Sequence, residues 1–310
     1  MNDPKDLIIV GAGIAGVSAA IYAKRSGLDF LIFEPQAVGG QLLLMQDIDN
    51  YVGIGLGLKG VQMAQTLVKT LDDLEIEVIN ERISKAEFEK DQVIFQSEDA
   101  TYIAKTAIIA TGASFKKLGL AKEAKFTGKG ISYCAVCDGF FFKGKDVAVV
   151  GGGNTAVEEA LYLSDIANKV TLIHRRDKLR SLDYLQKQLL AKDNVEIAYN
   201  SVVVEPKGKE LLEEIIIEDN LTKDKRTIAL QGLFVAIGIN PATEIFKELV
   251  ARDDKGFIIT DQEMKSSCDL VWACGDCRKR PLKQLITAAS EGATAALSAY
   301  KHIKGHYISS

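Results

Sequence analysis

The sequence lacks any apolar run of the about 18 residues that a membrane span needs. Its first residues, 1–6, are polar and mixed in charge, without the cationic start and apolar core of a signal peptide. It also lacks a charge excess, because 38 Lys and Arg side chains face 42 Asp and Glu side chains. We therefore expect a soluble, cytoplasmic protein whose partners are neither nucleic acid nor membrane.

Cysteine and histidine are scarce. The chain has five cysteines, and in a reducing compartment we expect them to be thiols unless they are catalytic or metal-bound, so a structural disulfide framework is not expected. The histidines show no metal-ligand spacing; they are His174, His302 and His306. No metal site is expected.

The most informative cysteines lie in the hexapeptide Cys134-Ala135-Val136-Cys137-Asp138-Gly139. On its own it fits a redox pair, a zinc ligand pair, a structural disulfide or buried core residues. Zinc would need a second pair, Cys274 and Cys277, which begins 137 residues after Cys137 (274 − 137), whereas structural zinc sites use compact knuckles. We expect Cys268, Cys274 and Cys277 to be buried small hydrophobes, with a second redox pair at Cys274/Cys277 as a minor hypothesis.

A dinucleotide-binding pattern opens the chain. An apolar run, 7–10, precedes Gly11-Ala12-Gly13-Ile14-Ala15-Gly16, and a helix and a second strand, 31–33, follow. Gly11 permits a tight turn, Gly13 lets the backbone approach a pyrophosphate, and Gly16 lets the helix pack on the strand. Glu34 stands 23 positions after Gly11 (34 − 11), where a carboxylate accepts hydrogen bonds from a ribose.

The pattern recurs with an offset of 140 residues (151 − 11). Strand 146–150 precedes a second glycine-rich loop, and no acid follows strand 170–173. The residues there are His174, Arg175 and Arg176, with Arg180 close behind. Arginines pair with a 2′-phosphate that an acid would repel, so the second unit should prefer NADP(H). The residues expected to bind NADPH are Gly151, Gly153, Asn154, Thr155, Ala156, His174, Arg175, Arg176, Arg180, Ile237 and Gly238.

The elements alternate as in an α/β protein. We expect helices at 17–25, 60–71, 157–166 and 283–300, and antiparallel strands in 83–105 and 195–230. Strands 107–110 and 233–236 close the two dinucleotide units in the same way. The fold class is therefore α/β with two Rossmann-like dinucleotide-binding domains, each of three layers (ββα), the second inserted in the first.

The whole chain resembles the low-molecular-weight thioredoxin reductases of bacteria and archaea. The resemblance rests on the joint order of seven motifs. They are Gly11-Gly13-Gly16, Gly39-Gly40-Gln41-Leu42, Ala110-Thr111-Gly112, the Cys134–Phe141 box, the Gly151–Ala160 box, His174-Arg175-Arg176 with Arg180, and Gly275-Asp276. The chain departs from the family's usual pattern at Cys274 and Cys277, at Lys283 and in Tyr51-Val52-Gly53.

The resemblance implies an FAD-binding domain formed by residues 1–115 and 245–310 and an NADPH-binding domain of residues 116–244 that carries the cysteine pair. It also implies a homodimer and a thioredoxin or thioredoxin-like small disulfide protein as partner. The FAD-binding residues that it implies are Gly11, Gly13, Ala15, Gly16, Glu34, Gly40, Gln41, Leu42, Asn50, Thr111, Gly112, Gly275, Asp276, Lys283, Gln284 and Leu285.

The implied activity is that of a thioredoxin-disulfide reductase, with electrons passing from NADPH through FAD to the Cys134–Cys137 disulfide and then to the partner. By resemblance, Cys137 is the flavin-proximal thiol and Cys134 attacks the partner. Asp138 is the expected acid/base, although Asp-Gly is also a common turn pair. Since the cysteine pair and the nucleotide loop share one domain yet serve one flavin, we hypothesise that this domain rotates about linkers near 115–117 and 243–245.

Two other enzymes of the same fold remain as alternatives. An NADPH–ferredoxin reductase-like flavoprotein would have no need of the cysteine pair. A ferredoxin-dependent thioredoxin reductase would have the pair without a working NADPH pocket, and the glycines and arginines of the second unit argue against it. A flavin-loaded redox scaffold is a third, non-enzymatic reading.

Overall fold

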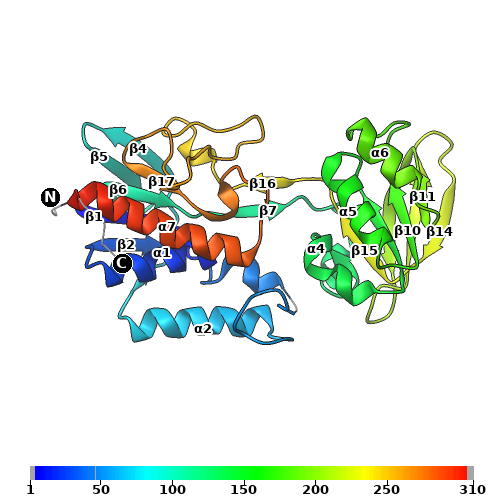
Figure 1. Ribbon diagram of the computed structural model, residues 1–310, viewed down its shortest axis with the longest axis horizontal. Coiled ribbons are helices and arrows are strands. Elements are labelled where there is room, and N and C mark those ends of the chain that lie inside the picture. Colours follow the sequence, from blue (N-terminus) through cyan, green and yellow to red (C-terminus); the bar gives the residue numbers. More distant parts are fainter. Residues whose placement is uncertain (1–3, 46, 306–310) are drawn as a thin grey trace. The chain divides into compact units, whose positions relative to one another are not determined.

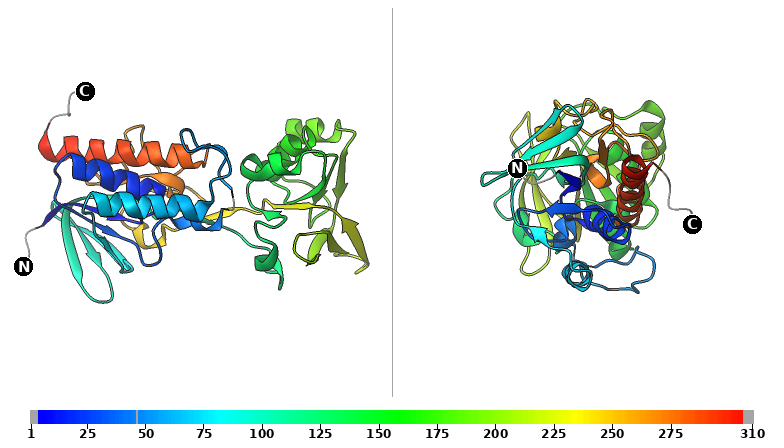
Figure 2. Two further views of the ribbon diagram at one scale, coloured as in Figure 1. Left: turned by 90° about the horizontal axis from the view of Figure 1, so that it is seen from below. Right: turned by 90° about the vertical axis from the view of Figure 1, so that its left-hand side faces the viewer.

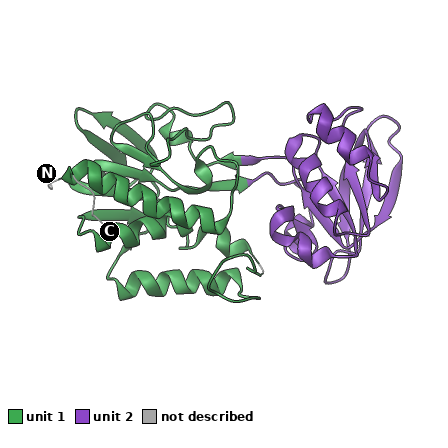
Figure 3. Ribbon diagram, in the orientation of Figure 1, with its two compact units in different colours: residues 1–114, 240–310 green, residues 115–239 purple. Residues whose placement is uncertain are grey.

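The computed structural model describes residues 4–45 and 47–305, and the chain divides into two compact units. Unit 1 comprises residues 1–114 and 240–310, and unit 2 comprises residues 115–239 (Figure 3). The second unit is thus inserted in the first. The two crossing segments, β7 (Ala113–Phe115) and β16 (Ile239–Pro241), pair with each other in a short two-stranded sheet. Within the described residues, no helix combines the length and the apolar character that a membrane span requires.

Unit 1 is built on a seven-stranded sheet. The strand order is β3-β2-β1-β6-β5-β4, with β17 added beside β6; β1, β2, β3, β6 and β17 are parallel and the β4–β5 hairpin is antiparallel. The strands are β1 (Lys5–Val10), β2 (Phe30–Phe33), β3 (Val78–Ile79), β4 (Lys85–Glu89), β5 (Gln92–Gln96), β6 (Thr101–Ile109) and β17 (Val271–Ala273).

Three layers form because successive side chains of β1 point to opposite faces of the sheet. Leu7 and Ile9 enter a core with the helices, whereas Ile8 and Val10 enter a second core with the hairpin residues Val93 and Phe95. Helices α1 (Ile14–Arg25) and α7 (Leu285–Lys304) lie side by side on the helical face, with α2 (Gly60–Asp73) next to them (Figures 1 and 2). Short 3-10 turns are η1 (Gly40–Leu44), η3 (Glu244–Phe246) and η4 (Gly275–Cys277).

Unit 2 repeats this plan with a five-stranded parallel sheet of order β11-β10-β9-β15-β8 and a separate antiparallel sheet of order β12-β13-β14. Side chains again alternate, with Val147 and Val149 facing the helices and Ala148 and Val150 facing the antiparallel sheet. The strands are β8 (Ile131–Ser132), β9 (Asp146–Val150), β10 (Lys169–Ile173), β11 (Val195–Ala198), β12 (Ser201–Lys207), β13 (Glu214–Asp219), β14 (Lys225–Ala229) and β15 (Gly232–Val235).

The helices of unit 2 are few. They are α3 (Glu123–Phe126), α4 (Ala135–Asp138), α5 (Asn154–Ser164) and α6 (Asp183–Leu190), with a 3-10 turn η2 (Gly139–Phe142) after α4. The expected fold class, two three-layer Rossmann-like domains, is confirmed. One expectation is wrong in detail: residues 195–198 do not begin the antiparallel sheet, because β11 pairs in parallel with β10 through Val195 and Val170.

A buried carboxylate organises the start of unit 2. Glu123 is 3% exposed, and its two oxygens accept N–H bonds from Leu118, Gly119 and Leu120 at 2.7–3.2 Å. Tyr133 donates its hydroxyl to the same side chain at 2.8 Å, and burial beside this acceptor raises the pKa of Tyr133 to about 12. Glu123 therefore holds the chain that enters unit 2 against the strand that leads to Cys134.

Replacing Glu123 with alanine should destabilise unit 2 by about 3 kcal/mol, because three buried N–H groups would lose their acceptor. Tyr133→Phe, which removes one of these hydrogen bonds, should cost only about 1 kcal/mol. Hydrogen–deuterium exchange of peptides from residues 115–239, followed against urea concentration, measures both. Equal losses for the two variants would show that the three N–H groups find other acceptors.

Candidate active site and nucleotide-binding loops

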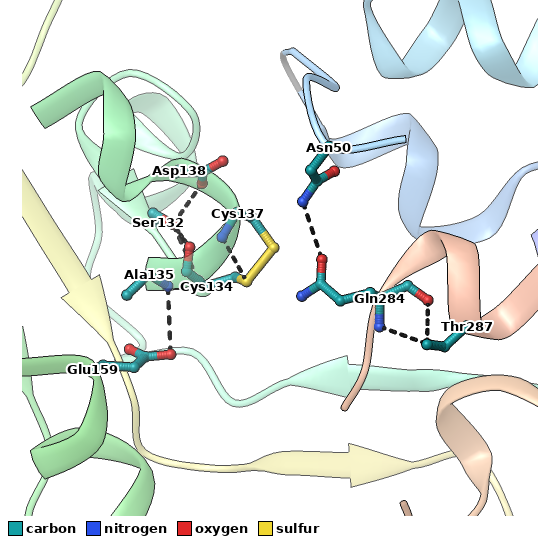
Figure 4. The surroundings of a disulfide bond; sticks show 9 residues. All are labelled: Asn50, Ser132, Cys134, Ala135, Cys137, Asp138, Glu159, Gln284 and Thr287. Atoms are coloured by element: carbon teal, nitrogen blue, oxygen red, sulfur yellow. Dashed lines mark hydrogen bonds between the residues drawn. A yellow bond between two sulfur atoms is a disulfide. The ribbon is translucent and has the colours of Figure 1, made fainter. Parts of the chain in front are cut away.

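The cysteine pair forms a disulfide at the start of a short helix. Cys134 is the residue before α4, Cys137 lies inside α4, and their Cα atoms are 5.3 Å apart (Figure 4). The Cys137 N–H donates to Cys134 Sγ at 3.2 Å. A donor in this position would stabilise a thiolate on Cys134 after reduction. The N–H of Cys137 thus lies where it would favour Cys134 over Cys137 as the thiolate of a reduced pair.

Asp138 is tied to the disulfide turn through a serine. Ser132, buried at the end of β8, donates its hydroxyl to Asp138 Oδ2 at 2.6 Å and accepts the Cys134 N–H at 3.1 Å (Figure 4). The Asp138 N–H in turn donates to the Cys134 carbonyl at 3.1 Å. One hydroxyl thus sets the position of both the expected acid/base and the backbone of the expected nucleophile. The sequence reading did not single out Ser132.

Helix α5 supports the turn from behind. Gly139, which follows α4, lies so close to α5 that a Cβ there would meet Tyr162 at 2.9 Å and Leu163 and Ile166 at 3.2 Å. Two apolar side chains of the same segment are exposed: Phe140 is 71% exposed and Val136 is 55% exposed.

The first glycine-rich loop has an open end. Helix α1 begins after Gly13 with no side-chain cap and no acidic residue in its first turn, so its first N–H groups have no carboxylate competitor. A Cβ on Gly13 would meet nothing within 4 Å, whereas one on Gly16 would lie 1.8 Å from the Gly11 carbonyl oxygen. Glu34 accepts the Ala12 N–H at 3.0 Å at the tip of β2. This cradle fits a pyrophosphate at the helix and a ribose at the acid.

The other residues expected to contact FAD also belong to unit 1, where most of them hold loops together. Gln41 donates to the Ala113 carbonyl at 3.0 Å, Thr111 donates to the Ala242 carbonyl at 2.7 Å, and Asn50 donates to Gln284 Oε1 at 3.1 Å (Figure 4). Leu42 is 1% exposed in the helical core, and Leu285 begins α7. Gly40 and Gly112 both have positive φ angles, at 54° and 68°.

A charged network that the sequence did not reveal surrounds Gly275 and Asp276. Glu291 on α7 accepts the Gly275 N–H at 2.9 Å and pairs with Arg278 and Arg280 at 2.5 and 3.0 Å, while Arg280 also pairs with Asp276. Lys283 donates to the carbonyls of Asp276 and Arg278 at 2.9 and 3.0 Å, and burial lowers its pKa. The network holds the segment after β17 against the start of α7. Arg278 and Arg280 precede Glu291 by eleven positions or more, so no local sequence pattern predicts these ion pairs.

The second glycine-rich loop has the same open end. Helix α5 begins after Gly153 with no side-chain cap and no acid in its first turn, and a Cβ on Gly153 would meet nothing within 4 Å. Asn154 accepts the Leu182 N–H at 3.0 Å, Thr155 is exposed, and Ala156 is buried under the loop. Ile237 and Gly238, expected at the same site, follow β15 in unit 2, and Ile237 is 38% exposed.

His174 lies beneath the second loop. Its ring is 3% exposed, with Nδ1 at 3.0 Å from the Gly151 carbonyl oxygen and Nε2 at 2.9 Å from that of Lys178. A Cβ on Gly152 would fall 2.1 Å from Nδ1, so a glycine is required there. The Arg180 N–H donates to the Gly152 carbonyl at 2.7 Å. Both ring nitrogens are therefore engaged by the backbone, and His174 holds the glycine-rich loop against the arginine turn.

The arginines of this turn remain available to a ligand. Arg175, Arg176 and Arg180 are exposed, and none of them forms an ion pair with another described residue. Burial and the nearby charges of Arg180 and Arg176 lower the pKa of His174. The turn is thus a cluster of unpaired positive charge beside an uncapped helix end, the arrangement that a phosphate monoester requires.

The remaining cysteines lie in unit 1. Cys274 and Cys277 are buried as expected, whereas Cys268 is only partly buried. Burial raises the pKa of Cys277 to about 11 and raises that of Cys274 as well, so both are inert thiols at neutral pH. Within residues 4–45 and 47–305, no group of three or more His, Cys, Asp or Glu side chains is placed to hold a metal ion.

Comparison with known proteins agrees with this geometry. The family model described as "Pyridine nucleotide-disulphide oxidoreductase" matches residues 5–292. The chain belongs to the pyridine nucleotide-disulphide oxidoreductase family. The thioredoxin reductase of Coxiella burnetii is 41% identical over 98% of both chains. A crystal structure of the thioredoxin reductase of Streptococcus pyogenes has a TM-score of 0.94 at 41% identity, covering 99% of this chain and 100% of that one.

Within the pyridine nucleotide-disulphide oxidoreductases, the chain is of the low-molecular-weight thioredoxin reductase type, as its motifs indicated. Membership makes it an oxidoreductase that uses a flavin and a nicotinamide cofactor. A ferredoxin-flavin thioredoxin reductase from Clostridium acetobutylicum is also similar, at 30% identity over 98% of both chains and a TM-score of 0.54. Because of that similarity, the electron donor could be a nicotinamide nucleotide or ferredoxin, and the nucleotide loop of unit 2 is the feature that distinguishes the two.

Ser132→Ala should lower the rate of thiol–disulfide exchange by about fivefold, because a hydrogen bond of about 1 kcal/mol that positions Asp138 is lost. The fold should persist. Ser164→Ala is the matched control, since Ser164 is also a buried serine of unit 2 but donates within α5 to the Leu161 carbonyl. Stopped-flow reduction of a small disulfide by the prereduced enzyme measures the rate. An equal effect of the two substitutions would mean that Ser132 only supports packing.

Proposed function

We propose that this protein is an NADPH-dependent thioredoxin-disulfide reductase in which FAD is bound by unit 1 and NADPH by unit 2. The observation that carries the proposal is the disulfide turn of unit 2. Cys134, Cys137 and the Ser132–Asp138 hydrogen bond are packed on α5, the helix whose first turn also carries the second nucleotide loop. A reactive disulfide and a nucleotide loop carried by the same unit suit a relay in which both serve one flavin.

The two nucleotide loops favour different cofactors. Glu34 at the tip of β2 suits an unphosphorylated ribose, as in FAD, whereas the exposed arginines after β10 suit the 2′-phosphate of NADPH. Bound FAD would accept a hydride equivalent from NADPH and deliver two electrons to a disulfide. Gly13, Gly153 and the uncapped starts of α1 and α5 would hold the pyrophosphates, and His174 would hold the second loop in shape.

The two cysteines then reduce the partner by thiol–disulfide exchange. Reduction breaks the Cys134–Cys137 bond and leaves one thiol and one thiolate. Cys134, which the Cys137 N–H favours as thiolate, attacks a sulfur of the partner's disulfide and releases the other as a thiolate. Asp138, positioned by Ser132, takes the proton of the Cys137 thiol and passes it to that leaving thiolate, which leaves Cys137 as a thiolate. Cys137 then attacks Cys134, which releases the reduced partner and restores the disulfide.

The partner on this proposal is a thioredoxin or a thioredoxin-like small disulfide protein in the cytoplasm. Exposed apolar side chains beside Cys134 would contact the apolar surroundings of such a protein's disulfide; they are Val136, Phe140 and Phe141. We also propose a homodimer. Its support is a second set of exposed apolar side chains on unit 1, at Leu44, Val61 and Val68, which a partner subunit would cover.

The alternative donor is ferredoxin, as in the similar enzyme from Clostridium acetobutylicum. A ferredoxin-dependent enzyme has no use for a 2′-phosphate site. The unpaired arginines beside the uncapped end of α5 therefore favour NADPH. The cysteine turn likewise disfavours an NADPH–ferredoxin reductase.

Cys137→Ser should abolish thioredoxin-linked turnover while NADPH still bleaches the flavin absorbance under anaerobic conditions, because the flavin would retain its donor but lose its acceptor disulfide. Cys268→Ser, which removes a partly buried thiol of unit 1, is the control and should keep both activities. The absence of bleaching with NADPH in the wild type would overturn the assignment of the donor. Unchanged turnover in Cys137→Ser would overturn the disulfide relay.

Arg175→Ala combined with Arg180→Ala should raise the KM for NADPH by about tenfold or more and leave the KM for NADH nearly unchanged, because charge-assisted hydrogen bonds to the 2′-phosphate would be lost. Arg226→Ala is the matched control, since Arg226 is an exposed arginine of unit 2 that pairs with Glu196 instead. Steady-state kinetics with each nucleotide distinguishes the cases. Equal changes for NADPH and NADH would show that these arginines do not read the phosphate.

A further inference from the structure

A half-buried glutamate side chain lies against the disulfide turn. Glu159 projects from α5, and its Oε1 accepts the Ala135 N–H at 3.5 Å, one residue after Cys134 (Figure 4). Its Oε2 is buried and has no hydrogen-bond partner among the described residues. A buried carboxylate oxygen without a partner is costly, whereas a protonated carboxyl group is tolerated. Glu159 has no role in the thiol–disulfide exchange proposed for Cys134, Cys137 and Asp138.

Among the described residues, no cationic side chain forms an ion pair with Glu159 that would offset its ionisation. The elements packed against α5 include α4, η2, α6, β9 and β10. The ionisable side chains on them and on α5 itself are Asp138, Asp183, Tyr184, Lys187, Asp146, Lys169, Glu158 and Tyr162, and none of them hydrogen-bonds to Glu159. Burial raises the pKa of Glu159 to about 7, and the Ala135 N–H lowers it by less. The carboxyl group therefore titrates in the physiological range.

We propose that Glu159 is a positioning residue of the disulfide turn and that its side-chain proton is coupled to the oxidation state of the Cys134–Cys137 pair. The inference rests on the proposed role of that pair as the redox centre. The oxidised turn is neutral, whereas the reduced turn carries a thiolate. A carboxylate on Glu159 repels that thiolate, and a carboxylic acid does not.

The coupling has a definite direction. Reduction breaks the S–S bond, takes up two electrons from the reductant and places one proton from solvent on one sulfur. Because the product is negative, the reduced turn holds the proton of Glu159 more tightly than the oxidised turn does. Above neutral pH, reduction therefore draws a second proton from solvent onto Glu159. When partner exchange restores the disulfide, Glu159 releases this proton again.

Glu159 and Asp138 have separate tasks. Figure 4 shows the turn lying between their two carboxyl groups, with Asp138 bound to Ser132 and Glu159 bound to the backbone of α4. Asp138 is placed to move a proton at sulfur. Glu159 accepts the Ala135 N–H of the turn and sets how readily the turn accepts negative charge.

The test is the equilibrium constant for reducing the disulfide, measured in the holoenzyme from about pH 5.5 to about pH 8.5. The enzyme is equilibrated in dithiothreitol redox buffers, quenched in acid and alkylated, and the modified Cys134 and Cys137 are counted by mass spectrometry. Glu159→Gln is the test variant, since it keeps the shape of a neutral carboxyl group. Glu158→Gln is the matched control, because Glu158 is its exposed neighbour on the same helix.

Wild type and Glu159→Gln should coincide at the acidic end, where Glu159 is protonated. At the alkaline end, Glu159→Gln should be reduced about tenfold more readily than the wild type, which corresponds to about 30 mV for a two-electron couple. Glu158→Gln should follow the wild type throughout. Parallel curves for wild type and Glu159→Gln, or the same deviation in Glu158→Gln, would overturn the coupling. A disulfide that dithiothreitol cannot reduce reversibly would instead overturn the proposed function.

Stability gives a second readout that does not depend on the redox chemistry. The pKa of Glu159 is about 7 in the folded, oxidised protein against 4.5 for the free side chain, so folding favours its protonated form. The stability of the wild type relative to Glu159→Gln should therefore be greatest below the unfolded value and fall as the pH rises through the folded value. A purely structural role for Glu159 would give a difference between the two proteins that does not vary with pH.

Discussion

The structure of unit 2 depends on two parts of α5: its first turn, which begins at the second glycine-rich loop, and the face that packs against the disulfide turn. Its first turn is uncapped and free of acids, which on the proposed function leaves those N–H groups open to a phosphate. Its body must pack tightly under the disulfide turn, which Gly139 permits by having no Cβ.

Two ionisable groups on or beside α5 have pKa values that burial shifts. His174 engages two backbone carbonyls and holds the second glycine-rich loop, although burial and two arginines lower its pKa. Glu159 engages one backbone N–H and leaves an oxygen without a partner. Both groups lie beside the predicted site, as groups with perturbed pKa values often do. In unit 1, Glu291 is satisfied instead by Arg278 and Arg280 and holds the Gly275 loop.

The sequence was sufficient where the signal is local. Glycines at fixed spacing between a strand and a helix, with Glu34 or the arginine run at the next strand tip, predicted both Rossmann-like domains and the open helix ends. It was insufficient where a contact joins distant segments. Ser132, Glu123, Glu159 and the Arg280–Glu291 pair owe their importance to tertiary packing, which no spacing encodes. The parallel pairing of β11 was missed because its sequence alternates in the same way as the antiparallel strands after it.

The central claim is that electrons from NADPH arrive at one cysteine pair. Anaerobic addition of NADPH to the holoenzyme without any partner, followed by acid quenching, alkylation and peptide mapping, tests it most directly. The account predicts that Cys134 and Cys137 become alkylated while Cys274 and Cys277, buried and with raised pKa values, do not. Alkylation at Cys274 and Cys277 instead, or at neither pair, would contradict it.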